Sequence, residues 1–337
     1  MADAATQPKE AAAAAAASTH ARPGLGQRLL GRFFPALFPP GEPLEAQRRL
    51  FLIALTAPVI TYVLVFAVYP AIVGLSYSLW RYNLLRPHRT AFVGFDNYVK
   101  FFSDPAMQAA LWNTAVFVVA AVILEFLLGF ALALLLWRDR LFSRICLALL
   151  LVPVTVTPLA TGLIFRALLT ADYGPIGYWA RILGISGERG FLGTPSTALA
   201  TIVVMDVWQW TPLMALILLA GLKAIPATTL EAARVDGATA LQRLTTIVVP
   251  LMVPSILLAL LLRMIDASMV FDTIYVTTNG GPNNATNVLM IAAVKEGLEF
   301  FNIGTASTIA TVMLALVGLM ATVFFLLIGR YEKKVAP

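Results

Sequence analysis

Charged side chains inside long apolar segments are the first residues of this sequence that could do chemistry. Glu125 lies near the middle of one such segment, and Arg263 and Asp266 lie close together in another. Asp206 and Asp272 occupy shallower positions. A charge within a membrane is costly, so such side chains normally face a bundle interior or a water-filled cavity. We therefore expect the deeper three to line an internal polar site.

The residues around Arg263 form one helical face. Arg263, Asp266, Ala267 and Val270 are spaced at i, i+3, i+4 and i+7, so a helix places them on the same side. An ion pair beside small residues can hydrogen-bond hydroxyl groups and leaves room for a ring. Trp210 in a separate apolar segment can stack on the apolar face of such a ring. Together they suggest a site for a hydroxyl-bearing solute.

The same residues have a purely structural interpretation. Arg263, Asp266 and Glu125 would form an internal salt-bridge network that only locks the helices together, and Trp210 would be an ordinary packing residue. The sequence leaves both interpretations open, and a site that serves both purposes is compatible with it.

The sequence gives little support for a metal, nucleotide or nucleic-acid site. Cys146 is the single cysteine, and His20 and His88 lie far apart in polar segments, so we expect no metal site. No phosphate-cradling G-x-x-x-x-G-K-[ST] motif occurs, so the chain is not expected to bind ATP or to be an enzyme. The net charge is +6, but the basic residues gather beside apolar segments, where they set membrane topology and do not predict nucleic-acid binding.

The composition predicts an integral membrane protein. Of 337 residues, 59% are hydrophobic and 12% are charged, against about 25% charged residues in soluble domains. Six stretches are long and apolar enough to cross a bilayer as helices of about 20 residues. The expected fold class is all-α, with six transmembrane helices at 50–80, 111–137, 145–169, 198–221, 246–276 and 304–329.

The distribution of basic residues predicts the orientation. The short loop 138–144 carries three arginines, and cytoplasmic loops are enriched in Lys and Arg. Both termini are therefore expected in the cytoplasm. Residues 1–47 are expected to form a polar cytoplasmic tail, in which 28–38 suits either a segment lying on the membrane surface or a linker. Residues 48–337 are expected to form the six-helix transmembrane domain.

One cytoplasmic loop, 222–250, differs from an ordinary connector. Thr228 and Glu231 have the spacing of a capping box and are expected to start a short helix. Gly237 then permits the turn that ends this helix, and a second helical stretch at 239–246 leads into the fifth span. We interpret the loop as a helix–turn–helix offered to a partner protein, with a face of small residues that allows close approach.

The residue spacing in this loop is specific. It has a Glu-Ala-Ala triplet, an Asp-Gly pair and an Ile-x-x-Pro ending, at Glu231, Ala232, Ala233, Asp236, Gly237, Ile247 and Pro250. The spacing resembles the EAA loop of ABC importer permeases, with Val249 where the family has Leu. The segment from Phe271 to Pro282 is similar to the one after the fifth core helix of maltose-, trehalose- and glycerol-phosphate-type permeases.

This resemblance to binding-protein-dependent carbohydrate permeases implies a type I ABC importer fold in a bacterial inner membrane. The loop would be the coupling helix that docks on a cytoplasmic ATPase. The implied partners are a second homologous permease, two ATPase subunits that bind ATP and Mg, an extracytoplasmic solute-binding protein, membrane lipid and a sugar. The chain itself would carry no cofactor.

The resemblance also implies which residues meet the solute. Sugar contacts in maltose-type permeases arise from the fourth and fifth core helices, and the matching positions are Gln209, Trp210, Leu213, Arg263, Asp266, Ala267 and Val270. We add Glu125 because of its depth. A neutral disaccharide is favoured; glycerol phosphate, a polyol, or secondary ion-coupled transport remain as alternatives.

Overall fold

A computed structural model describes residues 44–138 and 141–335, and these are mostly helical. Five helices in these ranges are long and apolar enough to cross a membrane, and a bent helix pair makes a sixth crossing if it counts as one span. The predicted all-α fold with six spans is confirmed in this form. The predicted interfacial segment 28–38 lies outside the described residues.

The chain divides into two compact units, residues 1–73 and 74–337. The described part of the first unit is one long helix that continues into the second. It consists of α3 (Leu44–Val63), the π-helical turn η1 (Leu64–Val68) and α4 (Tyr69–Ser78). Residues Phe51–Ser78 meet the length and hydropathy of a membrane span, which agrees with the first predicted span.

A segment of short elements precedes the second span. The strands β1 (Trp80–Arg81) and β2 (Ala91–Phe92) pair antiparallel on either side of the 3-10 turn η2 (Pro87–Arg89). Helix α5 (Asp96–Ser103) then leads to α6 (Pro105–Leu136). Asp104 caps α6 by accepting a hydrogen bond from the Ala106 backbone N–H at 2.8 Å. This cap starts the helix before the predicted 111.

The third predicted span is not a straight helix. Residues 145–169 fall on α7 (Leu141–Thr155) and α8 (Pro158–Leu169), which meet at an angle of 92°. Pro158 lacks a backbone N–H and fits the first turn of a helix, while the Thr157 hydroxyl accepts a hydrogen bond from Ala160 N–H at 3.4 Å. These residues start a new helix in a new direction. The short helix α9 (Pro175–Ile182) follows.

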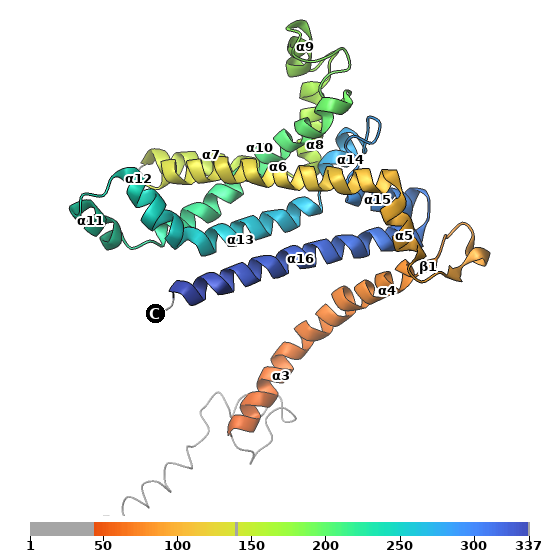
Figure 1. Cartoon of the computed structure of the whole chain (residues 1–337), viewed down its shortest axis with the longest axis horizontal. Coiled ribbons are helices and arrows are strands. Elements are labelled where there is room, and N and C mark those ends of the chain that lie inside the picture. The colour runs from red at the N-terminus through yellow and green to blue at the C-terminus, as the bar shows by residue number, and fades with distance from the viewer. Residues whose placement is uncertain (1–43, 139–140, 336–337) are drawn as a thin grey trace, which may run out of the picture. The chain divides into compact units, whose positions relative to one another are not determined.

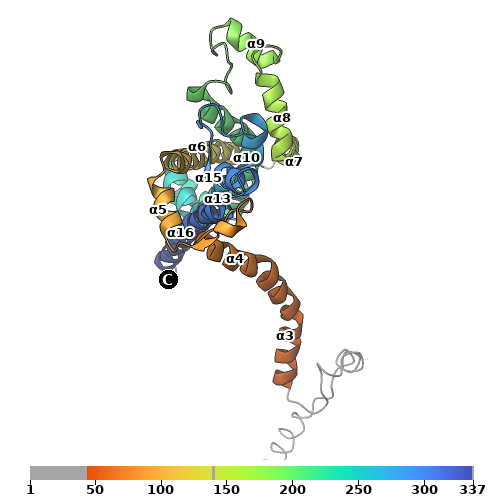
Figure 2. The ribbon, with the colours of Figure 1, turned by 90° about the vertical axis from the view of Figure 1, so that its right-hand side faces the viewer.

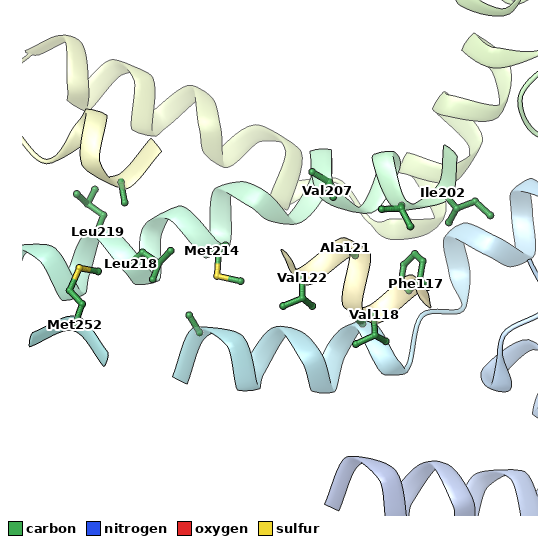
Figure 3. Close-up of a cluster of buried hydrophobic side chains, with 14 of the residues drawn as sticks. Phe117, Val118, Ala121, Val122, Ile202, Val207, Met214, Leu218, Leu219 and Met252 are labelled. Atoms are coloured by element: carbon green, nitrogen blue, oxygen red, sulfur yellow. The ribbon is translucent and has the colours of Figure 1, made fainter. Parts of the chain in front are cut away.

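The core of the second unit is built on α10 (Pro195–Lys223). This helix packs along α6 and also contacts α13, and its buried side chains include Ile202, Met214 and Leu218. Figure 3 shows Ile202 near Phe117 and Met214 near Val122 of α6, whereas Leu218 lies near Leu219 and Met252. Gly129 of α6 allows the close approach, because a Cβ there would lie 2.8 Å from the Met214 Cγ.

The fifth span begins earlier and ends earlier than predicted. After α11 (Ala227–Val235), the chain forms α12 (Ala240–Arg243), the π-helical turn η3 (Leu244–Val248) and α13 (Val249–Ser268) as one candidate span, Ala240–Ser268. The predicted end at 276 is wrong, because residues 269–271 leave the helical path and α14 (Asp272–Thr277) is separate. Hydropathy does not reveal this change, since the apolar character continues.

The remaining elements close the bundle. Helix α15 (Leu289–Val294) and the π-helical turn η4 (Lys295–Glu299) precede the last span, α16 (Ile303–Val335). Helices α6, α10, α13 and α16 lie alongside one another, as Figure 1 and the rotated view in Figure 2 both show. α14 packs on α8. The described residues of the second unit thus surround a core into which the deep polar side chains project.

Candidate functional site

One arginine joins three helices inside the second unit. The Nε of Arg263 on α13 donates to Glu125 Oε2 on α6 at 2.6 Å, and its Nη2 donates to Glu125 Oε1 at 2.8 Å. Nη2 also donates to Asp206 Oδ2 on α10 at 2.8 Å. Nη1 donates to Asp266, one turn further along α13. The structure thus brings together the three predicted deep charges and adds Asp206 to them.

Most of this cluster is inaccessible. Arg263 is 1% exposed, Glu125 0% and Asp206 7%, whereas the side chain of Asp266 is 57% exposed. Removing one member of a buried ion pair leaves an uncompensated charge, which typically costs about 3–5 kcal/mol. Arg263 and Glu125 therefore fit the salt-bridge alternative, because their polar atoms are occupied by each other. Asp266 is the member of the cluster that is open to a solute.

A small cavity of about 110 Å³ lies beside the cluster. Asp206, Trp210, Asp266, Ala267 and Val270 are among its lining residues. At about 30 Å³ per water, this volume holds a few water molecules and no disaccharide. The cavity therefore marks a polar position on a solute path, and a sugar would need the walls to move apart.

Trp210 connects the cavity to the charge cluster. Its half-buried indole lies with the ring centroid 5.0 Å from the Arg263 Cζ, within cation–π range. The same side chain lines the cavity beside Asp266. Trp210 thus packs on the arginine with one part and borders the cavity with another, so it combines the packing and stacking roles considered from the sequence.

Gln209 and Leu213 lie differently from the expected arrangement. The Gln209 side chain is 1% exposed, and its Nε2 donates to the Val156 carbonyl at the α7–α8 bend at 2.7 Å. Leu213 is half-buried and does not line the 110 Å³ cavity. Gln209 therefore secures the bend, and its amide is not directed at a solute in this conformation.

Asp206 is the site residue that sequence reasoning underrated. Its shallow position in the span suggested a minor role, yet it is buried and bonded to Arg263. Its spacing held a signal, because Asp206 precedes Trp210 by four residues and so shares that helical face.

The turn after the fifth span reverses the direction of the chain. Asn279 and Gly280 have positive φ angles of 48° and 84°. The Lys295 Nζ donates to the Asn279 carbonyl at 2.8 Å, and the Arg166 Nη1 of α8 donates to the Val276 carbonyl at 2.7 Å. These bonds tie the turn to α8 and to the start of η4, near the cavity-lining start of α14.

The loop 222–250 has the predicted helix–turn–helix form, but its caps differ. α11 begins at Ala227 directly after Pro226, with no side-chain cap, so the capping box expected at Thr228 and Glu231 is wrong. The capping box lies one helix later: Gln242 N–H donates to Thr239 Oγ1 at 3.3 Å, and Thr239 N–H donates to Gln242 Oε1 at 2.8 Å. Thr228 cannot cap, because the helix already includes Ala227 before it.

Gly237 ends α11 as expected. Its φ is +78°, its N–H donates to the Arg234 carbonyl at 3.1 Å, and the Ala238 N–H donates to the Ala233 carbonyl at 3.0 Å. These two bonds form a Schellman motif, which favours glycine at the left-handed position.

The exposed side of α11 carries the residues expected to meet a partner. Glu231, Ala232 and Asp236 are exposed, whereas Ala233 is 8% exposed and packs inward. The small-residue face predicted for Ala232 and Ala233 is therefore divided between the surface and the interior.

Comparison with known protein families assigns the chain to one of them. The model of the family described as binding-protein-dependent transport system inner membrane component matches residues 125–336. This match spans the Arg263 cluster, α11 and the whole of the loop. The chain belongs to this family. It is a permease of the ABC importers, which removes the secondary-transporter alternative.

Curated relatives match most of the permease. The trehalose/maltose transport system permease protein MalF of Thermococcus litoralis is 38% identical over 82% of this chain and 92% of its own length. The trehalose transport system permease protein SugA of Mycobacterium tuberculosis is 36% identical over 84% and 90%. The sulfoquinovosyl glycerol transport system permease protein SmoG of Agrobacterium fabrum is 34% identical over 81% and 88%.

A solved structure shows the same fold. A chain of the bacterial alginate ABC transporter, crystallised with an alginate pentasaccharide-bound periplasmic protein, has a TM-score of 0.71 to the permease at 20% identity. The alignment covers 83% of this chain and 94% of that one. The helical fold is therefore that of an ABC transporter permease.

Proposed function

We propose that this permease is one of two transmembrane subunits of an ATP-driven sugar importer in a bacterial inner membrane. An extracytoplasmic binding protein delivers a neutral sugar, with a disaccharide favoured, and a second homologous permease completes the pathway. Two separate ATPase subunits bind ATP and Mg and dock on α11. The trehalose and maltose named for the relatives support a disaccharide substrate.

One observation carries this proposal: a continuous helix joins the docking loop to the polar cluster. The span Ala240–Ser268 starts three residues after Gly237 and carries Arg263 and Asp266 near its other end. At 1.5 Å per residue, the distance from Ala240 to Arg263 is roughly 35 Å. Movement of the loop by a partner is thus transmitted directly to the cavity.

The mechanism follows from this connection. Closure of the ATPases moves α11, and the helix Ala240–Ser268 carries that movement to Asp266 and the cavity beside it. The cavity walls separate toward one side of the membrane and then toward the other, so the solute has access to each side in turn.

The charges favour a neutral solute over glycerol phosphate. The cluster contains one guanidinium and three carboxyl groups, and the guanidinium is already bonded to all three. No free cation of this cluster is available to pair with a phosphate, and Asp266 would repel it. A carboxylate is, however, a strong acceptor for sugar hydroxyls.

Transport assays with the assembled importer test the proposal. Proteoliposomes containing both permeases and the ATPases, with the binding protein outside, should accumulate labelled trehalose or maltose only when ATP is inside. Glycerol 3-phosphate should not be accumulated. An ionophore that removes ion gradients should leave sugar uptake unchanged.

Uptake that needs an ion gradient and ignores ATP would contradict the energy source proposed here. Uptake of glycerol 3-phosphate in preference to either disaccharide would contradict the substrate class while leaving the permease role intact.

A further inference from the structure

A second and larger pocket lies at the loop end of the transmembrane helices, away from the solute cavity. Its volume is about 460 Å³, and it is lined by the end of α6, by α11 and by the segment α12–η3. The proposed transport cycle moves two of these elements but assigns no role to the pocket between them. Its lining combines arginines, a tryptophan and aliphatic side chains.

Three arginines give the pocket its charge. Arg138, Arg234 and Arg243 line it, and its described lining includes no Asp or Glu. The Nη1 of Arg243 donates to the Ala238 carbonyl at 2.6 Å, which fixes this guanidinium at the pocket wall. Arg138 and Arg234 are exposed, and no hydrogen bond or ion pair joins their side chains to another described residue. Their positive charge is therefore available to an anion.

The rest of the lining is apolar and belongs to the membrane-spanning part. Leu134 and Trp137 lie at the end of the α6 span, and Leu230, Leu244 and Val248 complete the aliphatic wall. Tryptophan is enriched where a helix leaves the hydrocarbon, because its ring is apolar and its N–H is polar. The pocket thus combines three arginines with an apolar wall at the end of the α6 span, where a membrane-spanning helix is expected to meet the lipid headgroups.

We propose that this pocket binds the phosphate of an anionic phospholipid, with the glycerol and upper acyl chain against the aliphatic wall. Basic pockets between transmembrane helices are recognised sites for phospholipid headgroups. The aliphatic wall favours a lipid over free phosphate, which has no apolar part to bury. A lipid here would contact α6, α11 and the start of the fifth span together, and so would support the position of the docking loop.

Native mass spectrometry of the purified, assembled transporter tests this. Dioleoyl phosphatidylglycerol and dioleoyl phosphatidylcholine are added in equal amounts, so that only the headgroup charge differs. We expect phosphatidylglycerol to bind preferentially. The double variant Arg138→Gln/Arg234→Gln should weaken its binding about 25-fold, at about fivefold for each charge removed.

Two further variants make the test specific. Lys223→Gln/Arg330→Gln removes the same charge from exposed residues outside the pocket and should change binding less than about twofold, well under the about fivefold expected for each pocket arginine. Ala227→Trp fills the pocket from an exposed position, keeps all three arginines and should also abolish the preference. Thermal melting of each variant confirms that it folds.

Three results would overturn the proposal. The first is equal binding of the two lipids, and the second is an unchanged preference in both pocket variants. The third is displacement of phosphatidylglycerol by millimolar inorganic phosphate, which would show that the pocket takes free phosphate and has no need of a lipid.

Discussion

The Arg263 guanidinium is shared among three carboxyl groups, each at a different position around it. Glu125 takes two of its nitrogens, and Asp206 and Asp266 each accept from one of the nitrogens at its tip. A lysine offers a point charge and cannot reproduce this planar fork. The geometry of the cluster therefore depends on arginine, and its loss leaves buried carboxyls without a counter-charge.

We predict that Arg263→Met destabilises the assembled transporter by about 3–5 kcal/mol, because Glu125 and Asp206 remain buried and unpaired. Denaturant unfolding and thermal melting of the purified complex measure this. Arg263→Lys should lose less stability, because the positive charge remains. Adding Asp266→Leu to Arg263→Met should not restore stability, because Asp266 is the exposed partner; full recovery in that double variant would count against the network.

A different result is expected for Asp266→Asn. The substitution preserves size, and the side chain is largely exposed to the cavity, so melting should change little. Sugar affinity should fall about tenfold to a hundredfold, because a charge-assisted hydrogen bond contributes about 1.5–3 kcal/mol. Concentration-dependent uptake in proteoliposomes measures this. Unchanged uptake would limit Asp266 to a packing role.

Residue types and helical spacing were sufficient to predict part of the site. Glu125, Arg263 and Asp266 stood out because charges are rare in apolar spans, and they do lie together. The direction of an amide could not be predicted: Gln209 turns to a carbonyl freed by the α7–α8 bend, and the sequence does not show where that bend places its backbone. Which hydrogen-bond partner a side chain finds within a helix bundle depends on tertiary packing.

Among the elements, α11 and its following turn have the clearest conformational requirement. A residue other than glycine at 237 must adopt a left-handed conformation, at a cost of about 1 kcal/mol or more. The space around Gly237 is open, so this cost comes from the backbone and not from a clash.

We predict that Gly237→Ala greatly reduces ATP-driven uptake while membrane insertion and thermal melting of the bundle stay unchanged. Gly237→Asn should retain more uptake than Gly237→Ala, because asparagine tolerates the left-handed region. Uptake and ATPase stimulation are measured on the same preparations. Equal, normal activity of both variants would show that the turn is not required for coupling.

The caps of the loop give a second comparison. Thr239→Ala removes the capping box seen in the structure and should destabilise the start of the fifth span by about 1 kcal/mol. Thr228→Ala should have almost no such effect, because α11 has no side-chain cap. Hydrogen exchange of the amides in 240–248 distinguishes the two variants. The reverse order would restore the capping box expected from the sequence.

Element boundaries were predictable where a span ends in a polar segment and not where it changes direction. The second, fourth and sixth spans agree with the structure to within a few residues at most ends. Within 145–169 and 246–276 the apolar run continues through a break, so hydropathy has no signal there. Pro158 and its preceding threonine marked the first break, whereas residues 269–271 carry neither Gly nor Pro.

At the scale of the whole molecule, the orientation in the membrane remains a prediction. It rests on the arginines of 138–144 and on the cytoplasmic partner proposed for α11. Because Cys146 is the single cysteine, Cys146→Ser gives a background free of thiols.

In that background, Glu231→Cys should react with a membrane-impermeant thiol reagent only in inside-out vesicles. Arg86→Cys, in the segment between β1 and β2, should react only from the opposite side. Labelling of both thiols from one side, or of Glu231→Cys from outside intact cells, would reverse or discard the proposed topology.

The Arg263 cluster also constrains how the transporter can change conformation. Three helices joined through one guanidinium cannot slide past one another without breaking buried ion pairs, so α6, α10 and α13 should move as one rigid unit. The cavity can then widen only where its α10 and α13 walls meet Pro158 and residues 269–273. When a partner moves α11, the chain is expected to bend at hinges where the backbone already changes direction. These hinges are the α7–α8 bend and residues 269–271, which are the two places where the predicted continuous spans are interrupted.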